Sequence, residues 1–339
     1  MTTVAVAGAG RWGRNLVRNF ATLPDCELRW VVEPDAGRRE RVEAQYPTVR
    51  TSDRLDPVLA DPDVEAVVVS APARDHHAIG TAALSAGKHV YVEKPLALTL
   101  EDARDLERCA AEAERILMTG HLLLYHPAVL YLKDLIDRGE LGDVYYLYSQ
   151  RVNLGMIRRD ENALWSFAPH DLSVMLHLLG EEPVSVSARG AAYIQPGIED
   201  VVFVNLRFAD DRMGQVQLSW LDPHKIRKFT VVGSKKMAVF DDTAPQEKIR
   251  VYDKGVDQPG DYATYGDSIG LRFGDVMIPR IDPSEPLRLE CQEFIDCIRT
   301  GRAPRSDGAS GVQVVRVLSA ASESLARDGA PVELTEASR

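Results

Sequence analysis

Cysteine is scarce in this sequence, which has 4 cysteines among 339 residues. Cys26, Cys109, Cys291 and Cys297 form no Cys-x-x-Cys pair and lie within apolar or helical patterns. Disulfide-rich secreted domains and zinc sites need cysteines paired at short spacings. We therefore expect reduced thiols in a cytoplasmic protein without a metal site.

Long apolar runs and an excess of basic charge are also missing. No run reaches the roughly 20 apolar residues that cross a bilayer, and we expect no secretion signal because a strand-like run begins at residue 3. Lys and Arg number 40 against 51 Asp and Glu, which gives a net charge of −11. Wrapping a polyanion needs a basic surface. The composition therefore argues against membranes and nucleic acids as partners.

What the first third of the chain contains is an alternation of short apolar runs with amphipathic stretches. The strand-like runs lie at residues 4–7, 28–32, 66–70, 89–92 and 116–119. The helical stretches lie at residues 16–23, 36–45, 77–86 and 100–114. Such alternation is typical of βαβ units and predicts a doubly wound parallel sheet.

After about residue 142 the pattern changes to consecutive strands. Strand-like runs lie at residues 144–152, 184–193, 200–208, 214–220, 226–232 and 237–240. They predict one large antiparallel sheet, interrupted by a helix at 168–179. Residues 253–284 are rich in Gly, Pro, Asp and Tyr and predict a long loop. Amphipathic stretches at 287–299 and 311–327 predict final helices that cover the sheet or return to the first domain. We expect two domains, 1–120 and 121–339.

Residues 8–13 read Gly-Ala-Gly-Arg-Trp-Gly, directly after the first strand and before a helix. Glycines at this spacing let backbone amides and a helix N-terminus approach a pyrophosphate. Glu33 ends the second predicted strand, where a carboxylate binds ribose hydroxyls and repels a 2′-phosphate. The pattern predicts a dinucleotide site that prefers NAD. Arg38 and Arg39 leave NADP as the less favoured option, because an arginine can accept a 2′-phosphate.

Two further residues carry groups suited to proton and charge transfer. Lys94 follows a predicted strand in Glu93-Lys94-Pro95, and the carboxyl ends of such strands line the ligand crevice. An ammonium group there can polarise a carbonyl or exchange a proton with an alcohol. His170 follows Pro169, a residue suited to the first turn of a helix, and histidine is the usual proton carrier near neutral pH. Taken alone, Lys94 is better explained as a surface lysine before a helix-starting proline, whereas His170 could equally be a buried structural histidine.

Together these motifs resemble the glucose-fructose oxidoreductase / inositol dehydrogenase / rhizopine catabolism (Gfo/Idh/MocA) family over nearly the whole chain. Further matching segments are Ser70-Ala71-Pro72 with His76, residues 86–90 running into Glu93-Lys94-Pro95, residues 139–144 and 293–298, Gly301, and Asp307-Gly308. The resemblance implies an α/β protein: an N-terminal Rossmann domain with a doubly wound parallel sheet, then an α+β domain with a large open, mostly antiparallel sheet. It also implies a homodimer or homotetramer formed through the open sheet face.

The resemblance implies roles for individual residues. Lys94 and His170 match the catalytic lysine and histidine. The cofactor-binding residues are then Gly8, Gly10, Arg11, Trp12, Gly13, Glu33, Arg38, Ser70, Pro72, His76, Glu93 and Lys94. The substrate contacts are Lys94, His121, Arg151, Asn153, Arg158, Trp165, Ser166 and His170, although Arg151, Asn153 and Arg158 suit solvated loop positions equally well.

The sequence departs from the family pattern beside the histidine. Ser166 and Ser173 stand where many members carry aspartate. The loss of these acceptors implies a less basic His170 or a substrate that is held differently. Asp171 points about 100° away around a helix and is no automatic replacement.

The run at residues 151–155, with 162–165 and 168–171, is most similar to members that act on nucleotide-sugars. We therefore predict an NAD-dependent oxidoreductase that transfers hydride between the nicotinamide and a secondary hydroxyl or ketone of a sugar, at C3 of a nucleotide-sugar. Two alternatives stay open. One is a dehydrogenase of an inositol, another cyclitol or a free sugar; the other is a non-catalytic NAD-binding sensor.

Overall fold

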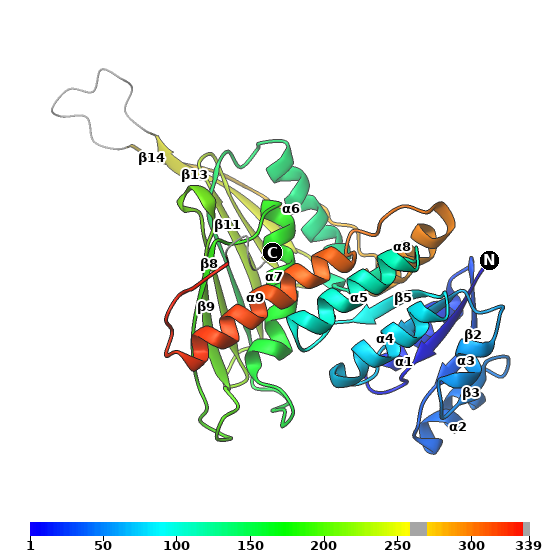
Figure 1. Ribbon diagram of the computed structural model, residues 1–339. Coiled ribbons are helices and arrows are strands. Elements are labelled where there is room, and N and C mark those ends of the chain that lie inside the picture. The colour runs from blue at the N-terminus through cyan, green and yellow to red at the C-terminus, as the bar shows by residue number, and fades with distance from the viewer. Residues whose placement is uncertain (258–269, 335–339) are drawn as a thin grey trace. The chain divides into compact units, whose positions relative to one another are not determined.

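The computed structural model describes residues 1–257 and 270–334 (Figure 1). The chain divides into two compact units, each with its own sheet. Unit 1 comprises Met1–Tyr125 and Ser284–Arg316, and unit 2 comprises His126–Pro283 and Val317–Arg339. None of the helices in the described part of the chain is both long and apolar enough to span a bilayer.

Unit 1 is built on a parallel sheet, in which the described residues form six strands in the order β3-β2-β1-β4-β5-β6. The strands are β1 (Thr2–Ala7), β2 (Cys26–Val32), β3 (Arg50–Ser52), β4 (Ala66–Val69), β5 (His89–Glu93) and β6 (Leu117–Gly120). β1 and β4 are buried along their whole length, as expected for strands covered on both faces. The predicted doubly wound sheet is confirmed. The edge strand β3 escaped prediction because it is short and has no apolar run.

The helices of unit 1 cover both faces of this sheet. They are α1 (Gly13–Thr22), α2 (Ala36–Gln45), α3 (Asp56–Ala60), α4 (His76–Ser85), α5 (Leu100–Glu112) and α8 (Pro286–Thr300), with the 3-10 turns η1 (Ala73–Asp75) and η2 (Leu122–Tyr125). The strand order reverses between β1 and β4, so right-handed crossovers place α1 and α4 on opposite faces. This reversal point is where an open α/β sheet binds its ligand.

Helix α8, orange in Figure 1, belongs to unit 1 although it follows all the strands of unit 2 except β15. The Phe294 ring lies 6.5 Å from Phe20 of α1 and 5.8 Å from Tyr91 of β5. The apolar stripe of α8 therefore completes the core of unit 1. This differs from the two-domain expectation of 1–120 and 121–339, because sequence position alone does not reveal which core a returning helix joins.

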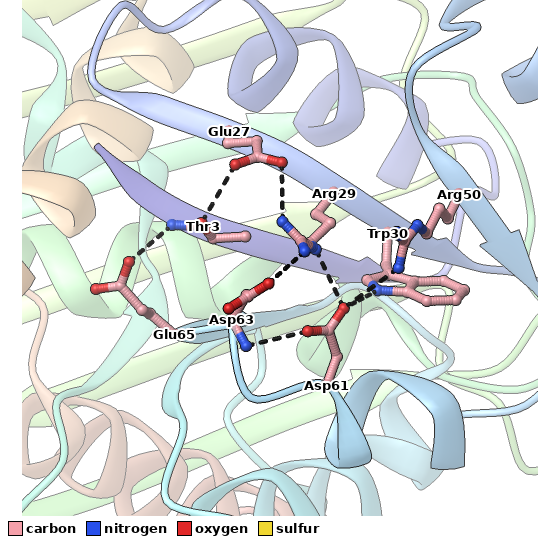
Figure 2. Close-up of polar contacts among 8 residues, drawn as sticks. All are labelled: Thr3, Glu27, Arg29, Trp30, Arg50, Asp61, Asp63 and Glu65. Atoms are coloured by element: carbon pink, nitrogen blue, oxygen red, sulfur yellow. Dashed lines mark hydrogen bonds and ion pairs between the residues drawn. The ribbon is translucent and has the colours of Figure 1, made fainter.

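A polar network lies in unit 1 where β1 and β4 begin (Figure 2). The Asp61 carboxylate accepts hydrogen bonds from Trp30 Nε1 at 2.8 Å and Arg29 Nε at 3.1 Å. Arg50 stacks over the Trp30 ring at 5.4 Å and lies 3.7 Å from Asp61. The network continues through Thr3, Glu27, Asp63 and Glu65. The hydrogen bonds that Asp61 accepts, of which the one from Trp30 has the largest effect, lower the pKa of its carboxyl group. The negative charge of Asp61 is therefore stabilised by its neighbours.

Unit 2 is built on a sheet in which the described residues form nine strands, in the order β14-β13-β12-β11-β7-β10-β9-β8-β15. These are β7 (Val144–Val152), β8 (Ser185–Ala191), β9 (Val201–Arg207), β10 (Met213–Ser219), β11 (Ile226–Gly233), β12 (Met237–Asp241), β13 (Ile249–Asp257), β14 (Gly270–Met277) and β15 (Val332–Glu333). Among the described strands of this sheet, only β7 and β10 pair in parallel. The predicted large, mostly antiparallel sheet is confirmed.

In the part of the chain that the structure describes, helices cover one face of this sheet and leave the other open. They are α6 (Pro127–Asp137), which packs on β12, and α7 (Ala163–Leu179), which packs on β7, β9 and β10. The last turns of α9 (Gly308–Ala326) join them, since Ser324 Oγ accepts a hydrogen bond from the backbone of Ala188 in β8. Buried and exposed residues alternate along β9 and β10, as expected for strands with one solvated face. A short 3-10 turn, η3 (Ala209–Asp211), joins β9 to β10.

Two local predictions in unit 2 are wrong. The long loop predicted at 253–284 contains the end of β13 and all of β14, which pair with each other; residues 258–269 lie outside the described residues. The ladder satisfies backbone groups there despite the Gly-rich composition. The helix predicted from 168 begins at Ala163, because the Asn162 side chain caps it by accepting a hydrogen bond from Trp165 N at 3.1 Å. Pro169 and His170 therefore lie inside α7 and not in its first turn.

Candidate functional site

The glycine-rich loop between β1 and α1 is tightly packed against the ends of β2 and β4. Gly8 has a φ of +104°, and its amide donates to Val32 O at 2.7 Å. A Cβ atom on Gly13 would lie 2.0 Å from Gly8 O, and Ser70 Oγ donates to that same oxygen at 2.6 Å. No side chain of the described residues caps the N-terminus of α1, and Arg11 is exposed on the loop. The loop is thus a preformed backbone cradle of the kind that accepts a pyrophosphate.

Glu33 anchors this loop from the end of β2. Its buried carboxylate accepts hydrogen bonds from Ala9 N at 2.8 Å and Asp35 N at 3.1 Å. The Arg38 guanidinium lies 3.4 Å from the same carboxylate and close to Gly10. Glu33, the acid expected to bind a ribose, and Arg38, the arginine that could accept a 2′-phosphate, therefore lie next to each other.

Glu93, at the end of β5, ties the Glu-Lys-Pro turn to the glycine-rich loop. Its Oε1 accepts a hydrogen bond from Trp12 Nε1 at 2.5 Å and one from the Tyr91 hydroxyl at 3.3 Å. Its Oε2 accepts a bond from the backbone amide of Lys94 at 3.2 Å. Burial raises the pKa of Glu93, while Trp12 and the Lys94 charge oppose that rise. The predicted cofactor residues Trp12 and Glu93 are thus in direct contact.

His76 braces the same turn from the start of α4. One ring nitrogen lies 2.8 Å from Pro95 O and the other 3.0 Å from Ala71 O. Burial is the largest effect on this side chain and lowers its pKa. A neutral imidazole joins the segment from Ser70 to Pro72 to the turn after β5, which suits a residue that shapes a pocket.

His121 follows β6 directly, at the same sheet edge as Lys94. Glu93 pairs with Gly120 in the β5–β6 ladder, so the two strands end together. His121 is 1% exposed, and neither ring nitrogen has a hydrogen-bond partner among the residues that the structure describes. Burial, reinforced by the Lys94 charge, lowers its pKa to about 3. His121 is therefore a neutral imidazole with one donor and one acceptor unused.

Unit 2 places a buried ion pair next to His170. Arg151 in β7 donates to the Asp171 carboxylate of α7 at 2.6 Å through Nε and at 3.3 Å through Nη2. Both side chains are buried. Ser173 Oγ donates to the backbone oxygen of His170 at 3.0 Å, while Ser166 is buried one turn earlier. The guanidinium of Arg151, predicted to contact the substrate, is thus already paired with an acid of its own unit.

The other predicted substrate residues have contacts of their own in unit 2. Arg158 lies 2.7 Å from the Glu161 carboxylate. Trp165 Nε1 donates to Ser322 Oγ at 3.0 Å. Asn153 follows β7 and is half-buried. Of the two predicted catalytic residues, Lys94 belongs to unit 1 and His170 to unit 2.

Sequence reasoning missed Glu290. This acid of α8 is fully buried in the core of unit 1. The available signal was spacing: Leu287, Glu290, Cys291 and Phe294 follow the i, i+3, i+4, i+7 pattern of a buried helical face. An acid on such a stripe is costly to bury, and this cost distinguishes Glu290 from the apolar residues around it.

Comparison with known proteins agrees with this geometry. Residues 2–121 match an oxidoreductase family model with an NAD-binding Rossmann fold, and residues 129–239 match the GFO/IDH/MocA C-terminal domain. The NAD(+)-dependent scyllo-inositol 2-dehydrogenase of Bacillus subtilis is 29% identical over 345 residues, which cover 97% of this chain and 95% of that protein. UDP-N-acetylglucosamine 3-dehydrogenase of Acidithiobacillus ferrooxidans is 27% identical over 311 residues, covering 91% and 93%.

Solved structures show the same similarity along the chain. GenD2 from gentamicin A biosynthesis, in complex with NAD, superposes with a TM-score of 0.82 at 26% identity, covering 98% of this chain and 96% of that one. The resemblance inferred from the motifs is confirmed.

Proposed function

This chain belongs to the GFO/IDH/MocA family of NAD-binding oxidoreductases, and on that premise we propose that it transfers hydride between NAD and C3 of a nucleotide-sugar. The observation that carries the proposal is the hydrogen bond from Trp12 to Glu93, which joins the dinucleotide loop to the turn that bears Lys94. The nucleotide-sugar is supported by the similarity to UDP-N-acetylglucosamine 3-dehydrogenase and by the segments around His170.

The residues of unit 1 suit NAD. The glycine-rich loop would hold the pyrophosphate, Glu33 the adenosine ribose, and Trp12 would lie along the cofactor. Bound NAD supplies the acceptor for a hydride. We favour NAD over NADP because the Glu33 carboxylate is already fixed at the loop by two backbone amides and would repel a 2′-phosphate.

We assign proton transfer, stabilisation of the alkoxide and binding of a polar ligand group to three side chains. In oxidation of a secondary alcohol, His170 would accept the proton of the hydroxyl group whose carbon gives up the hydride. Lys94 stabilises the developing alkoxide, and in the reverse direction His170 returns the proton. The unused donor and acceptor of His121 bind a polar group of the ligand at the edge that carries Lys94.

The open face of the unit 2 sheet is the proposed oligomer interface. Tyr146 and Tyr148 stack there with ring centroids 6.3 Å apart, and Phe203 and Met213 are exposed. Exposed apolar patches of this kind mark association sites. We expect a homodimer or homotetramer in sedimentation, and Phe203→Glu to raise the monomer fraction; a wild-type monomer would reject this interface.

The decisive test incubates the protein with NAD and a panel of nucleotide-sugars, free sugars and inositols while NADH absorbance is followed. We expect NADH with one nucleotide-sugar class, and loss of most turnover with retained NAD binding in His170→Ala. Turnover of free inositols without a nucleotide would select the activity of the Bacillus relative instead. Bound NAD with no turnover, and no oxidation of NADH by the matching keto-sugars, would select the sensor.

A further inference from the structure

Glu290 is an acid that the proposed chemistry does not use. It lies on α8 with 0% of its surface exposed. Neither Oε1 nor Oε2 has a hydrogen-bond partner among residues 1–257 and 270–334, the part of the chain that the structure describes. A buried carboxylate without donors is strongly destabilising, whereas the neutral acid is far less so.

Tyr91 connects this acid to the dinucleotide site. Its hydroxyl donates to Glu93 Oε1 at 3.3 Å, and its ring packs on Phe294 of α8. The charged groups that act most strongly on Tyr91 are Glu290 and then Glu93. A Cβ atom on Gly120 would lie 2.7 Å from the Tyr91 hydroxyl, so the phenol lies close against β6 at a position where only glycine fits.

The two acids differ in what compensates their charge. Glu93 accepts three hydrogen bonds and has the Lys94 ammonium as a neighbour. Burial, and after it the Glu93 charge, raise the pKa of Glu290, while interaction with the Tyr91 hydroxyl opposes that rise. The adjacent Cys291 thiol is also kept neutral by burial, which raises its pKa, so it adds no charge beside the two acids. The single negative charge of the pair therefore belongs on Glu93 and the proton on Glu290.

We propose that Glu290 is a positioning residue for the dinucleotide site. As a neutral acid it presents its proton to the Tyr91 oxygen, so the Tyr91 proton points to Glu93. Glu93 then keeps the charge that holds Trp12 and the Lys94 backbone. Glu290 acts through Glu93, so this inference depends on NAD binding and is independent of the sugar substrate.

The test measures NADH affinity as a function of pH in the wild type, Glu290→Leu and Glu290→Gln. NADH binding weakens as the pH falls through the pKa of Glu93, because protonation removes the charge that holds Trp12. Glu290→Leu removes the carboxyl group that donates to the Tyr91 oxygen, which raises the pKa of Glu93. We therefore expect the acid limb of the profile, the pH range in which NADH affinity is lost, to move up by about one pH unit, tenfold in the ionisation constant. Glu290→Gln, which retains a donor of the same shape, restores most of the shift.

The matched control is Glu293→Gln on the same helix. Glu293 pairs with Arg302 at 2.6 Å and contacts neither Tyr91 nor Glu93 in the interactions found among the described residues, so the acid limb stays in place. A Glu290→Leu profile that superimposes on the wild type overturns the proposal. So does a Glu290→Gln profile that matches Glu290→Leu.

Infrared spectroscopy checks the protonation state directly and needs no apolar variant to fold. We expect the carbonyl stretch of a protonated carboxyl group in the wild type at neutral pH and its loss in Glu290→Gln; its absence from the wild type overturns the proposal. Neither readout uses a sugar. If the protein turned over no sugar, the proposed function would be rejected, but the pH profile of NADH affinity and the infrared spectrum would still test the role of Glu290.

Discussion

The two ends of the parallel sheet in unit 1 differ in how fully their polar side chains are hydrogen-bonded. Where β1 and β4 begin, Asp61 has an indole, a guanidinium and a backbone amide as donors (Figure 2). Where β6 ends, the His121 ring is buried, and neither of its nitrogens has a hydrogen-bond partner among the described residues. A satisfied network stabilises the fold, whereas an unsatisfied buried group costs stability. The difference indicates that the carboxyl end retains its groups for a ligand.

The largest expected effect separates two lysines at the ends of one strand. Lys88 precedes β5 and donates to Asp61 O at 2.8 Å, whereas Lys94 follows β5. We expect Lys94→Ala to lower kcat by about 10²–10⁴-fold, because it removes a group that acts on the reacting oxygen. Lys88→Ala should leave kcat in place and cost about 1 kcal/mol in urea unfolding, the value of a lost hydrogen bond. Equal effects on kcat would remove the contrast between the two ends.

Substitution of His121 tests whether an unsatisfied group is kept for function. We expect His121→Leu to lower kcat/KM about tenfold or more without lowering Tm, because it removes a buried polar group that the fold leaves unpaired. Steady-state kinetics and thermal unfolding measure the two effects. A lower Tm with unchanged kinetics would make His121 a structural residue.

The same residue predicts a pH dependence of stability. The folded pKa of His121 is about 3, below the ordinary 6.5, so between these values the unfolded chain binds one proton more. Stability contributed by this group therefore falls as the pH drops below 6.5. We expect the loss between pH 7 and pH 5 to be about 2 kcal/mol smaller in His121→Leu than in the wild type, measured by urea unfolding. Parallel pH curves would contradict a neutral, buried imidazole.

Two neighbouring acids after β2 sharpen the comparison at the cofactor. Glu33 holds the glycine-rich loop, whereas Asp35 caps α2 by accepting a hydrogen bond from Arg38 N at 2.8 Å. We expect Glu33→Ala to weaken NAD binding about tenfold and to shift the NAD-to-NADP preference toward NADP. Asp35→Ala should cost about 1 kcal/mol of stability and leave that preference unchanged. Calorimetric titration of each variant with NAD and with NADP measures this preference, and an equal shift in both variants would contradict the prediction.

The smallest expected effects lie within the network of Figure 2. Asp61 joins Trp30 and Arg29, so Asp61→Ala should lower Tm by a few degrees. Asp63 is mostly exposed, and Asp63→Asn should barely change Tm, since exposed ion pairs contribute little. NADH affinity should be the same in both variants. A loss of NADH affinity in Asp61→Ala would show that the two ends of the sheet are coupled.

Local patterns allowed the sheets, the glycine-rich loop and the turn at Lys94 to be predicted. Each depends on neighbours in sequence: apolar runs, glycines at fixed spacing, and a strand that ends at Glu93 and is followed directly by Lys94. The start of α7 was mistaken because Pro169 suggests a first turn, while the Asn162 cap lies a full seven residues earlier in the chain. The two strands inside the predicted loop were missed because a ladder partner, not composition, makes them strands.

By itself, the sequence determined that this protein has a dinucleotide-binding parallel sheet followed by a large antiparallel one, because hydrophobic periodicity and glycine spacing are local properties. Only the tertiary structure decided which core α8 joins, which acid pairs with Arg151, and that His121 is buried without a hydrogen-bond partner among the described residues. These depend on contacts between residues far apart in the chain. Burial and desolvation, which determine the protonation of Glu290 and His121, exist only once those contacts have formed.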